Sequence, residues 1–393
     1  MISRNTNHAV TLLEEDANRA GLSWGAQRLP AQLVHLDTAA AGRASTATLQ
    51  AAAAHAEREA VVGAYIAQGE AEAVLETGRA ELGRLLGIQA RGLAFVESAS
   101  AALGTLLSAW PLDAGDTVAL VPSEWGPNLA AFDRHGLGVV QLAVHGDGTV
   151  DLADLERVLA DTRPAFVHLT QVASHRGLVQ PITQAALLCR AAGVALWVDA
   201  AQALGQVETA CGADVVYSTS RKWMTGPRGV GMLAVADRWW DTLRVSPSPL
   251  ARSSLPDDCS TVRLLESTEA NIAGRIGLCT AVRQHLDARP AEVWQRLAEV
   301  GRLTRQMLDD LPGWVVIDPL DAPSAITALR PAAGQDVVDT RARLLADYSI
   351  LTTACSPARA PLEMTEPLLR ISPHLDCSAE AIALLRTALT SAL

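Results

Sequence analysis

Cysteine is scarce in this sequence, and the six cysteines present lie far apart. No two of them form a Cys-x-x-Cys pair, so their spacing argues against a zinc site or a disulfide framework and fits a reducing compartment. Positive charge is also in deficit, because 32 Lys and Arg face 43 Asp and Glu and leave a formal net charge of -11. A chain with this charge is a poor match for nucleic acid or an anionic membrane surface.

Long apolar runs are missing as well. No segment approaches the roughly 20 consecutive apolar residues that a membrane-spanning helix needs, and residues 1–8 lack the apolar stretch of a secretion signal. We therefore expect a soluble, cytoplasmic protein. Hydrophobic residues make up 49% of the 393 residues and charged residues 19%, which is typical of a folded chain with room for a large core and a smaller second domain.

Short apolar segments alternate with helical patterns between about residues 90 and 235. This alternation predicts an α/β fold with a mainly parallel sheet that helices cover on both faces. The strands that we expect are residues 92–96, 117–122, 139–142, 165–170, 195–199, 214–218 and 229–236. The helices that we place between them include residues 100–109, 152–160 and 183–192.

The pattern changes outside this region. Residues 45–86 are rich in Ala and Glu and have helical periodicity, whereas prolines mark a loop or linker within 246–258. The segments that follow predict helices and strands at 271–288, 291–310, 325–330 and 367–372. We interpret the chain as a large domain of residues 31–255 and a small α/β domain formed by residues 1–30 and 256–393.

Lys222 is the most informative residue, because it follows one apolar strand and precedes a glycine-rich loop and a second strand. Asp199 ends the preceding strand. This spacing indicates a pyridoxal phosphate site in which the lysine forms the Schiff base and the aspartate keeps the pyridinium nitrogen protonated. A solvated lysine is the ordinary alternative, but Thr219, Ser220 and Arg221 offer hydroxyls and a guanidinium to a phosphate. Cationic and apolar neighbours also predict a lowered pKa for Lys222.

Other predicted strand ends carry side chains that suit the same cofactor. Residues 98–100 open a helix whose free N–H groups suit a phosphate, although simple capping is an alternative. Trp125 has the shape to stack on a pyridine ring, or is a half-buried loop residue. Ser174 offers a hydroxyl to the phenolate oxygen, and His175 is structural or functional. The guanidinium of Arg370 could bind a substrate carboxylate through two hydrogen bonds, or it could form a surface salt bridge.

Three segments, residues 35–42, 198–202 and 214–231, resemble the class V aminotransferase family, which has pyridoxal phosphate fold type I and includes cysteine desulfurases. The resemblance implies a small-molecule amino-acid substrate and a homodimer with its active site at the subunit interface. It also implies the residues that contact the cofactor. They are Ser98, Ala99, Ser100, Trp125, Ser174, Asp199, Gln202, Thr219, Arg221, Lys222 and, from the second subunit, Thr268. No metal is implied.

The chain departs from the desulfurases of this family at two positions. Arg221 stands where they have a histidine before the lysine. Cys355 lies near the position of their sulfur-carrying cysteine but out of register with it. The departures disfavour persulfide transfer, whereas β-elimination needs no thiol nucleophile.

The sequence further resembles the pyridoxal-phosphate-dependent sulfoxide lyases of ergothioneine biosynthesis, at residues 58–65, 174–181, 220–231 and 369–374. This resemblance implies a carbon–sulfur lyase that cleaves hercynylcysteine sulfoxide by β-elimination, giving a sulfenic acid that yields ergothioneine, with pyruvate and ammonia. Arg370 and Tyr65 would contact the substrate. The alternatives are a cysteine desulfurase or aminotransferase of the same family, and a protein that binds the cofactor without catalysis.

Overall fold

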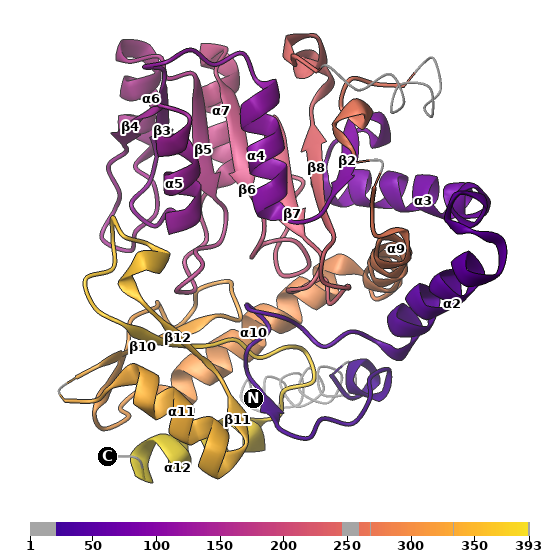
Figure 1. Cartoon of the computed structure of the whole chain (residues 1–393). Helices are drawn as coiled ribbons and strands as arrows, with labels where there is room; N and C mark the ends of the chain where they lie inside the picture. Colours follow the sequence, from indigo (N-terminus) through magenta and orange to yellow (C-terminus); the bar gives the residue numbers. More distant parts are fainter. Residues whose placement is uncertain (1–20, 246–258, 268, 333, 392–393) are drawn as a thin grey trace, which may run out of the picture.

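Seven strands form the central sheet, in the order β2-β8-β7-β6-β5-β3-β4 (Figure 1). β8 is antiparallel to both neighbours and the other pairs are parallel, which confirms the mainly parallel seven-stranded sheet expected from the sequence. The computed structural model describes residues 21–245, 259–267, 269–332 and 334–391. The strand bounds are β2 Leu93–Val96, β3 Thr117–Leu120, β4 Gly138–Gln141, β5 Phe166–Thr170, β6 Ala195–Asp199, β7 Val215–Thr219 and β8 Gly231–Val235.

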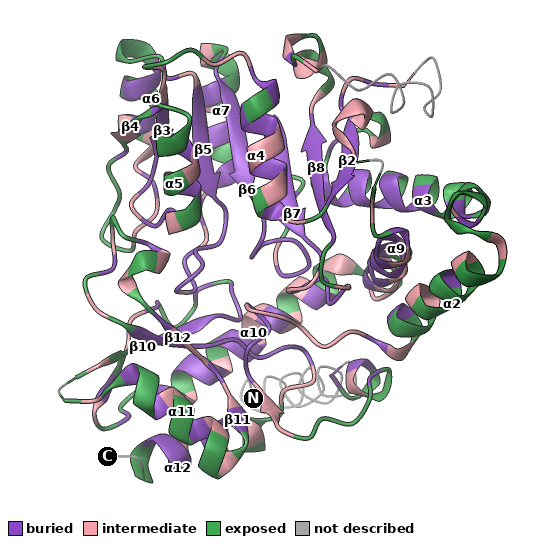
Figure 2. Cartoon of the chain, viewed as in Figure 1, coloured by how far each residue is buried: buried purple, intermediate pink, exposed green. Residues whose placement is uncertain are grey.

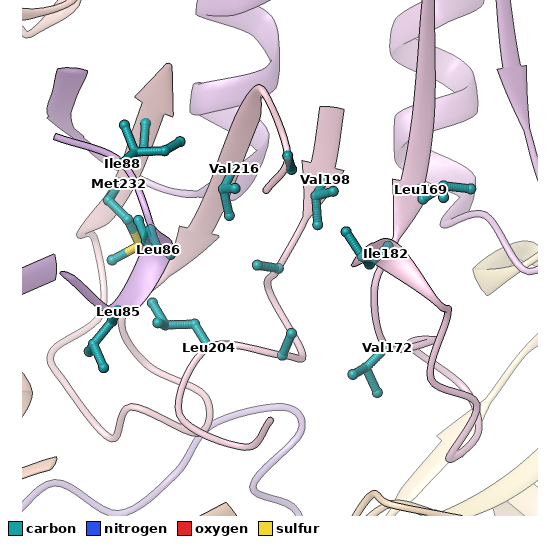
Figure 3. Packing of buried hydrophobic residues seen from close by; sticks show 14 of the residues in the cluster. Leu85, Leu86, Ile88, Leu169, Val172, Ile182, Val198, Leu204, Val216 and Met232 are labelled. Carbon is teal, nitrogen blue, oxygen red and sulfur yellow. The ribbon is translucent and has the colours of Figure 1, made fainter. Parts of the chain in front are cut away.

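Both faces of this sheet are covered, so strands β5, β6, β7 and β8 are buried at every position (Figure 2). On one face, Val198 and Val216 share a hydrophobic cluster with Ile182 (Figure 3). On the other face, Trp197 and Tyr217 belong to a separate cluster that contains apolar residues of α4 and α5. The covering helices are α4 Ala99–Ala109, α5 Gly126–Arg134, α6 Leu152–Asp161 and α7 Ile182–Ala192. Three of them match the predicted helices to within a residue, and α5 was not predicted.

The predicted helical region of residues 45–86 forms two helices, α2 Thr46–Val62 and α3 Ala64–Leu86. The break falls at Gly63, and Gly69 lies inside α3 without interrupting it. Ser45 caps α2 by accepting a hydrogen bond from the Thr48 N–H. Both helices pack against α9 Ile272–Asp287, a partner from much later in the sequence.

A second, antiparallel sheet has the order β12-β13-β10-β9, and a short parallel pair joins β1 to β11. Helices α10, α11 and α12 pack on this part of the chain. Asp37 follows β1 and bridges to Ser372, which brings the start of the described chain beside the end of β13. The bounds are β1 Val34–His35, β9 Trp314–Val316, β10 Thr327–Pro331, β11 Ile350–Leu351, β12 Thr353–Cys355, β13 Leu368–Ile371, α10 Pro290–Leu308, α11 Val337–Tyr348 and α12 Ala379–Ser391.

The division into a large domain of residues 31–255 and a small one of residues 1–30 and 256–393 stays a proposal. The linker expected at 246–258 lies outside the described residues. Within the described part of the chain, no helix is both long enough and apolar enough to cross a membrane.

Candidate active site

The carboxyl ends of the parallel strands border a cavity with about 520 Å³ of empty space, where an open α/β sheet places its ligands. Every predicted cofactor-contacting residue that the structure describes lines this cavity, and Thr170 and Ala201 join them. The predicted residues that line it are Ser98, Ala99, Ser100, Trp125, Ser174, Asp199, Gln202, Thr219, Arg221 and Lys222. Thr268 lies outside the described residues.

Lys222 lies just beyond the end of β7 and keeps part of its surface open to the cavity. Desolvation of its amine lowers the pKa of Lys222 to about 7. Asp199 opposes this shift, whereas the positive charges of Arg221, Arg370 and Arg359 add to it. The amine is therefore largely neutral in weakly basic solution, which is the form that attacks a carbonyl carbon or accepts a proton.

Asp199 ends β6 and is buried beside Lys222. Its Oδ1 accepts a hydrogen bond of 2.8 Å from the Ala201 N–H, and its Oδ2 accepts one of 3.0 Å from Nδ2 of Asn128. Burial raises the pKa of Asp199, while Lys222 and both hydrogen bonds act in the opposite direction. The carboxylate is thus held in one orientation at the floor of the cavity.

A buried hydrogen-bond network lies behind Asp199, and it was not predicted from the sequence. Asn128, which binds Asp199, also donates to Oε1 of Glu124 at 2.8 Å, and that oxygen accepts from the Trp125 N–H and the Thr170 hydroxyl. The i, i+4 spacing of Glu124 and Asn128 across the start of α5 was the available signal. The sequence has no regular periodicity over this helix, so the spacing by itself did not predict the network.

The network continues to the opposite oxygen of Glu124. Oε2 lies 2.7 Å from Nδ1 of His168, whose Nε2 lies 2.7 Å from the Tyr217 hydroxyl. Burial alone would raise the pKa of Glu124, but His168 and the hydrogen bonds to this carboxylate bring its pKa below the ordinary value. An ionised Glu124 only accepts, so Nδ1 of His168 donates to it. Burial raises the pKa of Tyr217 well above 10, which keeps its hydroxyl protonated.

The first turn of α4 forms another wall of the cavity. Ser98 caps this helix by accepting from the Ala101 N–H at 3.1 Å, so the capping interpretation holds for its hydroxyl. The N–H groups of Ala99 and Ser100 belong to a first helical turn, which lacks intrahelical acceptors and attracts anions. Gly231 begins β8 beside this turn, where an added Cβ would lie 2.8 Å from the carbonyl carbon of Ser98.

Ser174 and Gln202 both line the cavity, but only Gln202 has hydrogen-bond partners for its side chain among the described residues. The Ser174 hydroxyl is buried and has no partner among the described residues. Gln202 is already engaged, because Nε2 donates to the Ala39 carbonyl at 2.9 Å and Oε1 accepts from Nε1 of Trp223 at 2.8 Å. Gln202 therefore anchors the residue next to Lys222, a contact that the sequence did not suggest.

Arg370 lies in β13 and is fully buried. Its Nη1 donates to the Ser174 carbonyl at 2.7 Å, and its Nη2 contacts Oδ1 of Asp37 at 3.1 Å and the Thr353 hydroxyl at 3.2 Å. Nε of Arg370 has no partner in the described part of the chain. The surface salt bridge that was its alternative is excluded, because both the residue and its pair with Asp37 lie in the interior.

Arg370 itself is not among the residues that line the cavity and reaches it through its hydrogen bond to Ser174, and three further candidates lie away from it. Tyr65 is on α3 with 79% of its surface exposed, so this chain alone does not bring it to the site. His175 is buried with its Nε2 3.0 Å from the Glu363 carboxylate, and it does not line the cavity. Cys355 is fully buried in β12, where it pairs with Leu368, and its thiol does not line the cavity.

The residues present fit pyridoxal phosphate. A helix N-terminus with Thr219 and Arg221 beside it suits the phosphate, and the buried Asp199 suits a protonated ring nitrogen. The Ser174 hydroxyl, which has no partner among the described residues, could donate a hydrogen bond to the phenolate oxygen of the cofactor. The Lys222 amine, which is partly neutral, could attack the aldehyde carbon. These residue roles remain assignments by chemistry and position.

Residues 34–385 match the model of the class-V aminotransferase family, and the chain belongs to this family. The family is dependent on pyridoxal phosphate, which confirms the expected cofactor and the expectation of an enzyme.

The probable hercynylcysteine sulfoxide lyase of Mycobacterium tuberculosis (strain CDC 1551 / Oshkosh) is 45% identical over 372 residues, which cover 94% of this chain and 92% of that protein. The isopenicillin N epimerase of Streptomyces clavuligerus is 24% identical over 344 residues, covering 81% of this chain and 85% of that protein.

Solved structures share the fold. The cysteine desulfurase CsdA of Escherichia coli superimposes with a TM-score of 0.82 at 20% identity, covering 95% of this chain and 98% of that chain. The cystine C-S lyase C-DES, in complex with its product cysteine persulfide, superimposes with a TM-score of 0.80 at 17% identity, covering 92% of this chain and 98% of that chain. The likeness confirms fold type I.

Proposed function

We propose that this protein is a pyridoxal-phosphate-dependent carbon–sulfur lyase that cleaves hercynylcysteine sulfoxide by β-elimination. The products would be a sulfenic acid, which becomes ergothioneine on reduction, together with pyruvate and ammonia. The observation that carries the proposal is the cavity itself, where a lysine with a pKa of about 7 lies beside a buried aspartate and no cysteine is among the described residues that line the wall. The similarity to the mycobacterial protein supports the choice of substrate.

The roles of the residues follow from their chemistry. Bound pyridoxal phosphate supplies an electron sink for the charge that develops at the substrate Cα. Lys222, neutral above about pH 7, takes the proton from Cα. Asp199 keeps the ring nitrogen protonated, and its hydrogen bonds from Asn128 and Ala201 hold its orientation. The sulfoxide makes the sulfur group a good leaving group, so no protein nucleophile is needed.

Arg370 binds the α-carboxylate of the substrate. Its Nη2 contacts Asp37 and Thr353, and its Nη1 donates to the Ser174 carbonyl, which leaves Nε and the second N–H of Nη1 to bind a further acceptor. A carboxylate fixed at this point sets the orientation of the Cα–H bond toward Lys222, which contributes to the rate through positioning.

Cysteine desulfurase activity on the same fold is the second candidate, and one observation disfavours it. A desulfurase needs a thiolate that reaches the substrate sulfur, whereas Cys355 is fully buried within a strand pair away from the cavity. We further propose a cytoplasmic homodimer in which the second subunit completes the site. Its Thr268 would contact the phosphate, and its Tyr65 the substrate, which would explain why Tyr65 is exposed in the single chain.

The test is pyruvate release by the purified holoenzyme from a panel of cysteine thioethers and their sulfoxides, including hercynylcysteine sulfoxide. We expect pyruvate and ammonia in equal amounts, faster release from the sulfoxides, and loss of activity in Lys222→Ala. Keto-acid formation that requires an amino acceptor, without pyruvate, would indicate an aminotransferase. A persulfide on Cys355 would indicate a desulfurase.

A further inference from the structure

A short 3-10 helix, η4 (Pro357–Arg359), lies against the beginning of α5. The contact is close, because a Cβ at Gly126 would collide with the Ala358 carbonyl oxygen and lie 3.3 Å from Cδ of Pro361. Gly126 directly follows Trp125, which lines the cavity. The packing of η4 on α5 therefore places Arg359 next to the wall of the candidate active site.

The guanidinium of Arg359 lacks an anionic partner. Among the described residues it forms no ion pair, and its Nε is buried without any hydrogen-bond partner. Burial lowers the pKa of Arg359 and Arg370 adds to this effect, while Cys355 and Asp37 act in the opposite direction. Arg359 is half-buried, and its buried Nε has lost hydration without gaining an acceptor, a cost that a bound negative group would offset.

The charges around Lys222 are unbalanced. Arg221, Arg359 and Arg370 all act on its amine, and Asp199 is the negative group that opposes them. The other nearby carboxylate, Asp37, is bound to Arg370. Arg221 lies at the end of the cavity where the phosphate is expected, and Arg370 is assigned to the α-carboxylate. Asp37 and Cys355 also act on Arg359, but it forms no ion pair with a described residue, and neither the phosphate nor the α-carboxylate is assigned to it.

We propose that Arg359 binds a second carboxylate, carried by the sulfur-linked part of the substrate. This inference rests on the proposed function and deepens it, because it names the class of leaving group as an organosulfur compound with its own carboxylate. Hercynylcysteine sulfoxide belongs to this class, since its hercynine half carries a carboxylate besides the one in its cysteine half. Simple alkyl cysteine sulfoxides lack the second group and are expected to be poorer substrates.

The test uses two probe substrates of nearly equal shape, S-(4-carboxybenzyl)cysteine sulfoxide and its neutral S-(4-carbamoylbenzyl) counterpart. The measurement is the ratio of the two kcat/KM values for pyruvate release by the holoenzyme. We expect the parent enzyme to prefer the carboxylate by about 10–100-fold, the range for a hydrogen bond to a charged group. Arg359→Gln should bring this ratio close to one, and Arg359→Lys should retain part of it. Arg302→Gln, an exposed arginine of α10 that bonds to Gln306, is the matched control and should leave the ratio unchanged.

The results of this experiment distinguish a failure of the role assigned to Arg359 from a failure of the proposed lyase function. If Arg359→Gln weakens both probes equally, Arg359 binds the α-carboxylate and the inference is wrong. An unchanged ratio in Arg359→Gln would also overturn it, provided that the unfolding midpoint and cofactor content match those of the parent. Absence of pyruvate from both probes in the parent would instead contradict the proposed lyase function. Calorimetric binding of the two probes to the holoenzyme would then still measure the preference for the second carboxylate and its loss in Arg359→Gln.

Discussion

Lys222 shows how much a single residue depends on its surroundings. An exposed lysine is protonated in neutral solution, whereas burial and three nearby arginines bring the pKa of Lys222 to about 7. The amine therefore loses its proton close to neutral pH, and only the neutral amine forms a covalent bond with the cofactor aldehyde. The same property lets Lys222 act as the base of the proposed reaction.

We predict that cofactor capture by the apo-protein speeds up as the pH rises toward 7 and then levels off. Below pH 7 the rate constant should fall by about tenfold per pH unit, because the neutral fraction of Lys222 falls in that proportion. The growth of visible absorbance after mixing with pyridoxal phosphate gives the rate. N-acetyl-lysine is the control for titration of the cofactor itself, and a rate profile that matches this free amine would contradict the lowered pKa.

Glu124 is the second residue whose surroundings decide its role. It accepts four hydrogen bonds in the interior, from Asn128, Thr170, His168 and the Trp125 N–H. Glu124→Gln places an amide NH₂ against one of these donors, so we expect a loss of about 1–3 kcal/mol in the free energy of unfolding. Urea unfolding of the apo-protein measures this loss, with the exposed Glu156→Gln as the matched control.

The same substitution tests whether the network orients Asp199. Asn128 links Glu124 to Asp199, so a disturbed network should weaken cofactor binding by about tenfold, the effect of one lost hydrogen bond of this kind. Fluorescence titration with pyridoxal phosphate gives the affinity. An affinity equal to that of the parent would limit Glu124 to a role in stability.

At the scale of elements, the junction of α4 and β8 positions the expected phosphate site. A Cβ on Gly231 would lie 2.7 Å from the Ser218 carbonyl oxygen and within 2.9 Å of the Ser98 backbone. We therefore expect Gly231→Ala to push the first turn of α4 away from the strand, to weaken cofactor binding about tenfold or more and to cost about 1–3 kcal/mol of stability.

Gly104→Ala in the same helix is the control for Gly231→Ala. An added Cβ there meets no atom within 4 Å, and alanine is favoured over glycine in a helix by about 0.5–1 kcal/mol. The control should therefore be neutral or slightly more stable, with unchanged cofactor affinity. Equal affinities for the two variants would show that the close approach at Gly231 does not position the cofactor.

The elements that the sequence predicted well are the long ones. Strand β6 and helix α7 were placed to within a residue, because a buried strand or an amphipathic helix carries a clear periodicity. Several short elements escaped prediction. Strands β9, β11 and β12 have two or three residues and exist through pairing with distant strands, and α5 begins with a glycine and a proline.

At the scale of the whole molecule, the proposed homodimer makes a prediction about mass and about Tyr65. Light scattering after gel filtration should give twice the 41.4 kDa mass of the chain. The exposed Val61 and Ile66 flank Tyr65 at the α2–α3 junction and would lie in the interface. Ile66→Glu should therefore favour the monomer, and Leu187→Glu on α7 is the matched control at a similarly exposed position. A parent protein that elutes as a monomer at micromolar concentration would contradict the dimer.

The sequence alone determined the chemistry that local order encodes. The positions of Asp199 and Lys222 at successive strand ends, and the serines that open α4, identified the cofactor because strand ends of a parallel sheet meet at one edge. The tertiary structure decided what depends on residues far apart in the chain. It paired Arg370 with Asp37, joined Glu124 to His168 and Tyr217, and placed Arg359 beside the wall of the cavity. No local pattern records such contacts, because packing between elements creates them and sets the burial that shifts each charge.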